Sequence, residues 1–96
     1  MGAVRREGSC LKLGGPVHMS NVPALLAEAS PLLGPDIDCI DLAEVTEVDS
    51  AAVSLLLEWQ RQAARRGARL RFAHLPPALK SLAALYGVTD LLPEVE

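Results

Sequence analysis

The chain has 96 residues, half of them hydrophobic, and a formal net charge of -3 at pH 7. This length fits one compact domain, so we expect a single domain over residues 1–96. The acidic balance and the small number of aromatic residues disfavour nucleic-acid binding, which uses basic surfaces and stacked rings. No apolar run approaches the ~20 residues that span a bilayer, and no apolar segment follows Arg5 and Arg6 as in a signal peptide. We therefore expect a cytoplasmic protein that does not insert into a membrane.

The pattern of apolar residues and turn residues predicts strands that alternate with helices. Such alternation implies right-handed crossovers and parallel inner strands, and therefore an α/β fold. Glycine and proline pairs mark the ends of most segments. In chain order the predicted elements are an edge strand 4–7, a strand 10–13 ending in a turn at 14–16, a helix 20–30, a strand 37–42, a helix 50–66, a strand 70–74 and a helix 76–86.

The helix predicted over 50–66 carries more apolar residues than a sheet needs to cover it. At about 100° per residue, one face of this helix consists of Ala52, Leu55, Leu56, Trp59 and Ala63, and we expect this face to pack on the sheet. Val53, Leu57 and Ala64 form a flank beside it and widen the apolar arc to about 200°, roughly twice the usual stripe.

Two interpretations of this flank are open. The last helix or the C-terminal tail covers it, or a partner protein does. Exposed apolar strips that are rimmed by polar groups are typical of interfaces. The same projection places Ser50, Ser54 and Arg61 next to the flank, so a polar edge borders it near the start of the helix.

Charge is distributed unevenly along the chain. Six acidic residues and no basic one lie between positions 36 and 49, whereas five arginines and no acid lie between 61 and 71. One explanation is that the acidic and the basic segment form two solvated surfaces whose charges offset each other. Another is a surface with a negative and a positive end that orients a partner. The sequence leaves both explanations open.

Residues 39–57, CIDLAEVTEVDSAAVSLLL, resemble the signature of STAS domains, the family named from sulphate transporters and anti-sigma-factor antagonists. Its pattern is a hydrophobic strand ending in Asp-Leu, a short loop, Val-Asp-Ser/Thr and a helix start rich in small residues. The predicted order of elements matches along nearly the whole chain. The resemblance implies the STAS fold, a mostly parallel central sheet with an antiparallel edge strand and with helices packed mainly on one face.

Residues 81–88 are most similar to the MlaB type of STAS domain. The resemblance implies a non-catalytic protein that binds the ATPase subunit of an ABC-type phospholipid transporter and supports its assembly and activity. That transport maintains the lipid asymmetry of an outer membrane. The expected contact residues are Asp49, Ser50, Val53, Ser54, Leu57 and Arg61, with help from the final helix.

Similarity to anti-sigma-factor antagonists implies an alternative, because antagonists carry a phosphorylatable serine at the position of Ser50. A phosphate there adds a charge of about -1.5 to -2 beside Asp49 and Glu47. This added charge would displace a partner whose binding surface fits the uncharged hydroxyl. The partner would then be an anti-sigma factor with kinase activity. A purely structural interpretation is also open, since Ser50 or Asp49 as the helix N-cap contributes about 1 kcal/mol.

Two departures from the antagonist pattern favour the transporter subunit. Ala51 and Ala52 stand where antagonists usually carry a small residue and a glycine. The predicted turn over 14–18 also lacks the acidic residues that antagonists have there.

Catalytic and metal sites are disfavoured. No serine or cysteine lies in a nucleophile elbow or a triad pattern. The possible zinc ligands lack paired close spacings, and the cysteines have no redox spacing, so we expect buried free thiols. We therefore expect no cofactor and no metal. The residues considered for zinc are Cys10, His18, Cys39 and His74.

Overall fold

The computed structural model describes residues 3–95, which form one mixed sheet and a helical layer. The strands follow the order β1-β2-β3-β4, with β1 antiparallel to β2 and the other two pairings parallel. The expected mostly parallel sheet with an antiparallel edge strand is confirmed. The elements are β1 (Val4–Glu7), β2 (Cys10–Val17), α1 (Val22–Ala29), β3 (Cys39–Val48), α2 (Ser50–Ala64), β4 (Arg71–Ala73), α3 (Pro77–Leu85) and the 3-10 helix η1 (Thr89–Leu91).

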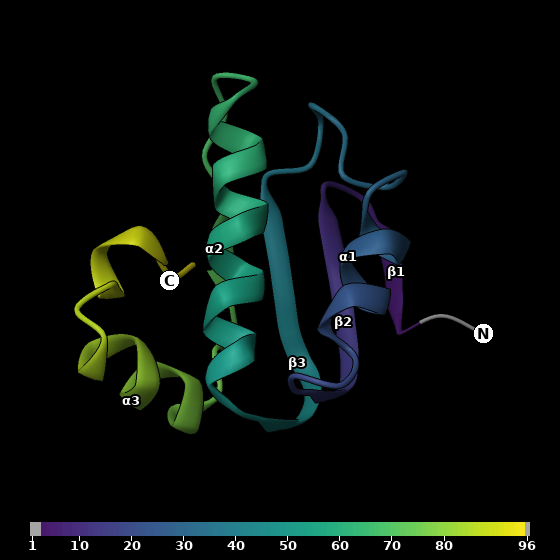
Figure 1. Ribbon diagram of the computed structural model, residues 1–96. Coiled ribbons are helices and arrows are strands. Elements are labelled where there is room, and N and C mark those ends of the chain that lie inside the picture. The colour runs from purple at the N-terminus through teal and green to yellow at the C-terminus, as the bar shows by residue number, and fades with distance from the viewer. Residues whose placement is uncertain (1–2, 96) are drawn as a thin grey trace.

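The helices lie on one side of the sheet, as expected. Figure 1 shows α2 in front of the strands, with α1 over β1 and β2 and with α3 and the C-terminal segment on the other side of α2. None of the helices described within residues 3–95 is long and apolar enough to cross a membrane.

The core lies between the sheet and α2. Alternate residues of a strand point to opposite faces, so every second side chain of β2 and β3 turns toward the helices. All five residues predicted on the sheet-facing side of α2 are buried, which confirms that prediction. The core side chains of the two central strands are Leu11, Leu13, Val17, Ile40 and Leu42, each exposed by 2% or less.

The turn predicted at 14–16 is wrong, because β2 continues through it to Val17. Register shifts on either side of Gly15 mark bulges in the pairing with β3, and Gly15 adopts a φ of 77° that favours glycine. Pro16 is tolerated because β1 pairs only as far as Leu13, so no strand on that side needs its missing N–H. The glycines and the proline therefore bend a continuous strand.

Other element ends differ by a few residues. β3 continues beyond Leu42 to Val48, because the unexpected second half of β2 pairs with it. α2 ends at Ala64, two residues before the predicted end, and α3 ends at Leu85. The tail forms η1 and then a parallel bridge between Glu94 and Phe72, which protects the edge of β4.

Gln60 of α2 holds the C-terminal part of the fold together. Its Nε2 donates to the carbonyl oxygens of Leu70 and Leu91, each at 3.0 Å. Its Oε1 accepts a hydrogen bond from the backbone N–H of Leu70 at 2.7 Å. One side chain thus ties α2 to the segment before β4 and to η1.

We expect Gln60→Leu to destabilise the fold by about 1–3 kcal/mol, because it leaves the backbone groups of the buried residue Leu70 without their partner. Urea unfolding measures the loss. Gln62→Leu is the matched control on the same helix, since within residues 3–95 the Gln62 side chain bonds only to Glu58, at 3.3 Å. Equal losses in the two variants would contradict the role assigned to Gln60.

Candidate docking site at the start of α2

α2 begins at the Asp49-Ser50 pair of the signature. Asp49 is the N-cap, and its Oδ1 accepts a hydrogen bond from the N–H of Ala51 at 2.8 Å. Its Oδ2 accepts from the N–H of Met19 at 3.1 Å, which ties the helix start to the turn after β2. Ser50 is exposed, and its hydroxyl makes no hydrogen bond to any residue in the described part of the chain. Asp49 is therefore the capping residue, and the Ser50 hydroxyl is left facing solvent.

We expect Asp49→Ala to lower the free energy of unfolding by about 1 kcal/mol, since it removes the cap of α2. Ser50→Ala is the control and should change stability by less than half as much. Thermal and urea unfolding of both variants measure the difference. A larger loss from Ser50→Ala would mean that the two residues exchange these roles in solution.

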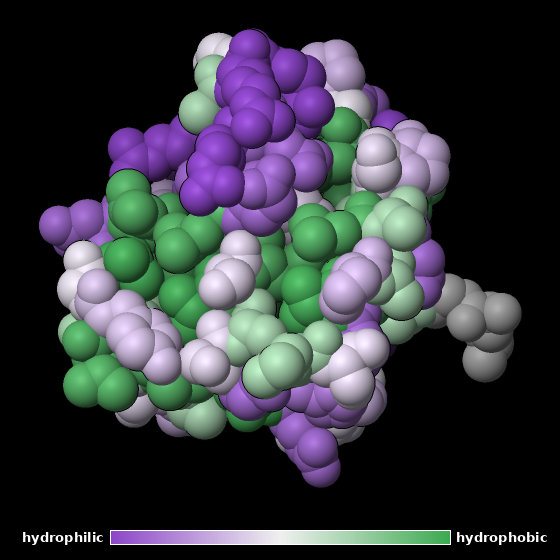
Figure 2. Space-filling view, viewed as in Figure 1, coloured by the Kyte–Doolittle hydropathy of each residue, from purple (hydrophilic) through white to green (hydrophobic). Residues whose placement is uncertain are grey.

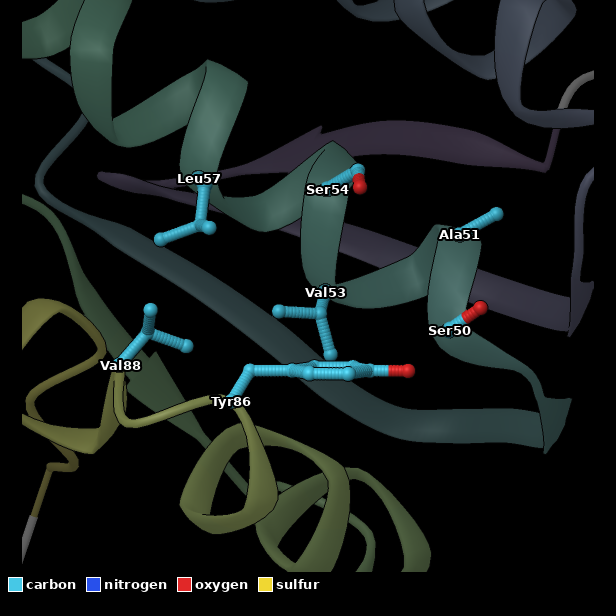
Figure 3. A pocket seen from close by; sticks show the side chains of 7 residues that line it. All are labelled: Ser50, Ala51, Val53, Ser54, Leu57, Tyr86 and Val88. Atoms are coloured by element: carbon cyan, nitrogen blue, oxygen red, sulfur yellow. The ribbon is translucent and has the colours of Figure 1, made fainter.

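A groove of about 390 Å³ opens between the first turns of α2 and the end of α3. Figure 3 shows the ring of Tyr86 lying beneath Val53, with its hydroxyl directed toward the Ser50 end of α2. The walls are mostly apolar, and the serine hydroxyls lie on the α2 side. The lining residues are Ser50, Ala51, Val53, Ser54, Leu57, Tyr86 and Val88.

The structure divides the predicted apolar flank of α2. Val53 is only 4% exposed and belongs to the core, so the interpretation of Val53 as free surface is wrong. Leu57 is half-buried and Ala64 is exposed. The end of α3, through Tyr86, contributes the cover over Val53 (Figure 3). The last helix thus covers the start of the flank and leaves the rest at the surface.

Leu57 lies where three grooves meet. It lines the groove beneath Tyr86, a second one of about 460 Å³ shared with α1, and a third of about 270 Å³ shared with η1. We call the surface around it the apolar face. Figure 2, which looks onto the helical layer, shows hydrophobic residues gathered across its middle below a hydrophilic region. The apolar face consists of Val22, Leu26, Leu57, Tyr86, Val88 and Leu91.

Two of these residues are large and half exposed, Tyr86 at 51% and Leu91 at 52%. Ser54 lies between the first two grooves, and Arg61 lines the second and third. Arg61 is exposed and forms an ion pair with Glu58 one turn earlier. Of the predicted contact residues, four therefore line one groove, Arg61 borders the next, and Asp49 acts beneath the surface as the cap.

The sequence pattern did not mark Tyr86, Val88 or Leu91 as site residues. A signal existed only for Tyr86, since Gly87 after it ends α3 with a φ of 70° and turns the chain back toward α2. The backbone N–H of Val88 donates to Ala83, which fixes that turn. The contacts with α2 are long-range, and local periodicity does not show them.

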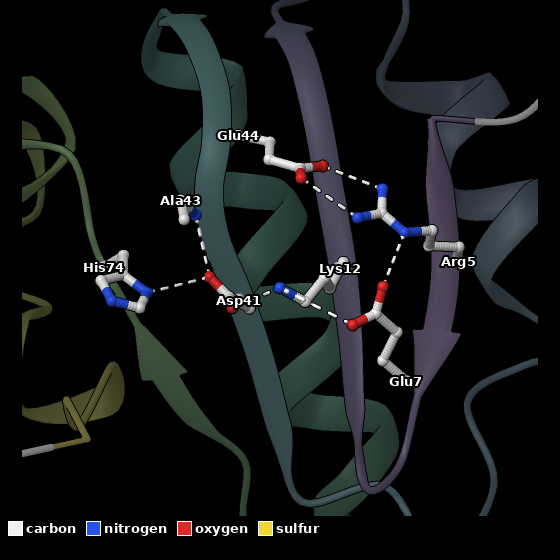
Figure 4. A network of polar contacts seen from close by, with 7 residues as sticks. All are labelled: Arg5, Glu7, Lys12, Asp41, Ala43, Glu44 and His74. Atoms are coloured by element: carbon white, nitrogen blue, oxygen red, sulfur yellow. Dashed lines mark hydrogen bonds and ion pairs between the residues drawn. The ribbon is translucent and has the colours of Figure 1, made fainter.

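The opposite face of the sheet is polar and carries no helix (Figure 4). Arg5 of β1 donates to both carboxylate oxygens of Glu44, at 2.8 and 3.1 Å, and to Glu7 at 3.0 Å. The hydrogen bonds and the charge of Arg5 hold the pKa of Glu44 below its usual range. The charge of Glu44, one of the acidic residues between positions 36 and 49, is thus neutralised by Arg5 of β1.

Asp41 is the centre of a second cluster on this face (Figure 4). Burial raises its pKa, but hydrogen bonds from the N–H of Ala43, from His74 at 3.0 Å and from Lys12 outweigh burial, so its pKa lies below the usual range. Lys12 lies 3.3 Å from Asp41. These pairs favour the interpretation of the acidic segment as a locally balanced surface, on the side of the sheet away from the apolar face.

Comparison with known families decides the classification. The family model described as "Mlab, STAS domain" matches residues 3–93. The chain belongs to the MlaB-type STAS domain family. This MlaB-type chain shares its fold with a solved structure of the anti-sigma factor antagonist SpoIIAA in its unphosphorylated form, with a TM-score of 0.71. The match covers 97% of this chain and 86% of SpoIIAA at 15% sequence identity, so it shows the fold alone and confirms the expected STAS architecture. No curated protein sequence matches.

The MlaB-type site has the chemistry of a contact surface. Apolar side chains form its walls and hydroxyls and one arginine its rim, which is the composition of a protein–protein interface. STAS domains act through such protein–protein contacts. Within residues 3–95 no three side chains of His, Cys, Asp or Glu lie close enough together to hold a metal ion.

Proposed function

We propose that this chain is the STAS subunit that binds the ATPase subunit of an ABC-type phospholipid transporter and supports its assembly and activity, without a reaction of its own. The apolar face around Leu57 carries this proposal, since it leaves half-exposed apolar side chains beside the first turns of α2. Membership of the MlaB-type family supports the identity of the partner. The chain then works at the cytoplasmic side of the inner membrane, held there by its partner.

The arrangement of the apolar face suits this role. Interfaces owe most of their binding energy to a few central side chains that fill pockets and are shielded from water by a rim. Tyr86 and Leu57 occupy the central position here, and Ser50, Ser54 and Arg61 supply the rim. A loop or helix of the ATPase that fills the groove would bury the exposed half of Tyr86, and a phenol ring is a frequent interface anchor.

The experiment is a binding titration of the purified chain with the phospholipid-transporter ATPase subunit from the same genome. We expect Leu57→Asp to weaken binding at least tenfold, or about 1.4 kcal/mol, because a carboxylate would be buried at the junction of the grooves. Leu32→Asp is the matched control, since Leu32 is also half-buried against the core but lines none of the three grooves.

Ser54→Lys tests the same surface without disturbing the core. Ser54 is exposed, and a lysine there lies one turn before Glu58, a favourable spacing on a helix. We expect weaker ATPase binding with unchanged stability, whereas Ser81→Lys, an exposed serine of α3 outside the groove, should bind normally. Binding that is unchanged in both Leu57→Asp and Ser54→Lys would refute the proposed surface.

One observation favours a second candidate, an antagonist that binds an anti-sigma factor and is switched by phosphorylation of Ser50. The Ser50 hydroxyl is exposed at the first residue of α2 and is not needed as a cap, because Asp49 serves as the cap. Exposure of an unbonded hydroxyl is what a kinase requires. The likeness of the fold to SpoIIAA fits this candidate too.

Incubation with the anti-sigma-factor kinase of the same genome and MgATP, followed by mass spectrometry, separates the two candidates. The transporter proposal predicts no phosphate on Ser50 and full ATPase binding after the incubation. The antagonist candidate predicts a phosphate that Ser50→Ala abolishes and Ser54→Ala retains. It also predicts loss of anti-sigma-factor binding once Ser50 is modified, because the added charge lies in the groove beside Tyr86.

A further inference from the structure

Cys10 and Cys39 are distant in the sequence but lie side by side in the sheet. They are register partners in the parallel strands β2 and β3. Their neighbours Leu11 and Ile40 turn toward the helices and are buried, so the two cysteines turn to the opposite face of the sheet. The sequence spacing suggested no redox pair, but the pairing register places the two thiols beside each other.

The two thiols lie at a groove of about 440 Å³ on the open side of the sheet. Cys10 is half-buried and Cys39 is 8% exposed, so a small reagent reaches Cys10 first. Arg71 is the register partner of Cys39 on β4, and Arg69 lines the same groove. Asp38 lines the groove too, so two arginines and one carboxylate lie around the thiols.

The environments of the two thiols differ in a way that sets an order of reaction. Burial and, to a smaller extent, the neighbouring Cys10 thiol raise the pKa of Cys39 to about 12. A thiol of this kind reacts poorly with a reagent from solution. It reacts only with a sulfur that is already beside it, as Cys10 is.

The spacing of the strands permits a covalent link. Neighbouring strands lie about 4.8 Å apart, and register partners therefore fall within the range of about 4.4–6.8 Å between Cα atoms that a disulfide spans. Exchange of protein thiols with a small disulfide is an equilibrium, so a bond formed in this way can also be reduced again.

We propose that Cys10 and Cys39 form a reversible intramolecular disulfide by exchange with a small disulfide such as oxidised glutathione. The Cys10 thiolate attacks one sulfur of oxidised glutathione, forms a mixed disulfide and releases one glutathione thiolate. Cys39 then loses its proton to solvent and attacks Sγ of Cys10, which releases the second glutathione. Two protein thiols are oxidised by two electrons, and one oxidised glutathione is reduced to two molecules of glutathione.

This dithiol site is independent of the proposed docking function. It lies on the open face of the sheet, whereas the apolar face lies on the helical layer. The disulfide would join β2 to β3 beside the buried pair Leu11 and Ile40, which are the next register partners. Oxidation would therefore link β2 and β3 at the residues where both strands begin, and it would leave the surface around Leu57 unchanged.

The test is a redox titration of the full chain in mixtures of oxidised and reduced glutathione, quenched with N-ethylmaleimide and read by intact mass and peptide mapping. We expect both thiols to disappear together from the monomer, with a linked peptide pair containing Cys10 and Cys39, and to return at reducing ratios. Cys39→Ser should stop at one glutathione on Cys10. Cys10→Ser should stay unmodified, since its remaining thiol is buried.

Two outcomes would overturn the proposal. One is glutathione on both cysteines of the wild-type chain without a linked peptide. The other is a disulfide found only between two chains. The decisive reading comes from the wild-type protein, so it does not depend on the folding of either variant, and circular dichroism of each variant verifies that the comparison uses folded protein.

Discussion

The packing of α2 on the two central strands is the constraint on which the rest of the structure depends. Trp59 of α2 is buried in the same core cluster as the strand residues Ile40 and Phe72, which have no exposed surface. α2 is also apolar on its flank, and the sheet covers only the side that faces it. The end of α3 folds over Val53 for this reason, and Leu57 remains at the surface because no further element is present among the described residues to cover it.

Placing all helices on one side of the sheet gives the protein two faces of different chemistry. The helical side is apolar around Leu57 and suits a partner protein. On the open side, charged side chains of neighbouring strands form ion pairs with one another, such as Arg5 with Glu44 and Lys12 with Asp41. Exposed ion pairs of this kind add little to the free energy of unfolding. Charged side chains on an uncovered sheet do discourage its strands from pairing with another chain. The two thiols belong to this open side, so the proposed dithiol site is spatially separate from the proposed docking surface.

The start of α2 shows how one local contact leaves a residue available for function. Because Asp49 satisfies the N–H of Ala51, the helix does not need the hydroxyl of Ser50. The same carboxylate holds the N–H of Met19 and so fixes where the signature segment lies against the turn after β2. The Ser50 hydroxyl on this capped helix end is therefore accessible to either of the proposed partners, an ATPase subunit or a kinase.

The sequence by itself determined the order of strands and helices along the chain, the sheet-facing side of α2 and the presence of a short edge strand at residues 4–7. Each of these follows from local features, such as the 3.6-residue spacing around Trp59 or the glycine that ends a helix. The tertiary structure alone decided that β2 runs through Gly15, that Tyr86 lies against Val53 and that Cys10 faces Cys39. Strand register and helix packing join residues that are far apart in the chain, and no local pattern encodes which distant residue completes a contact.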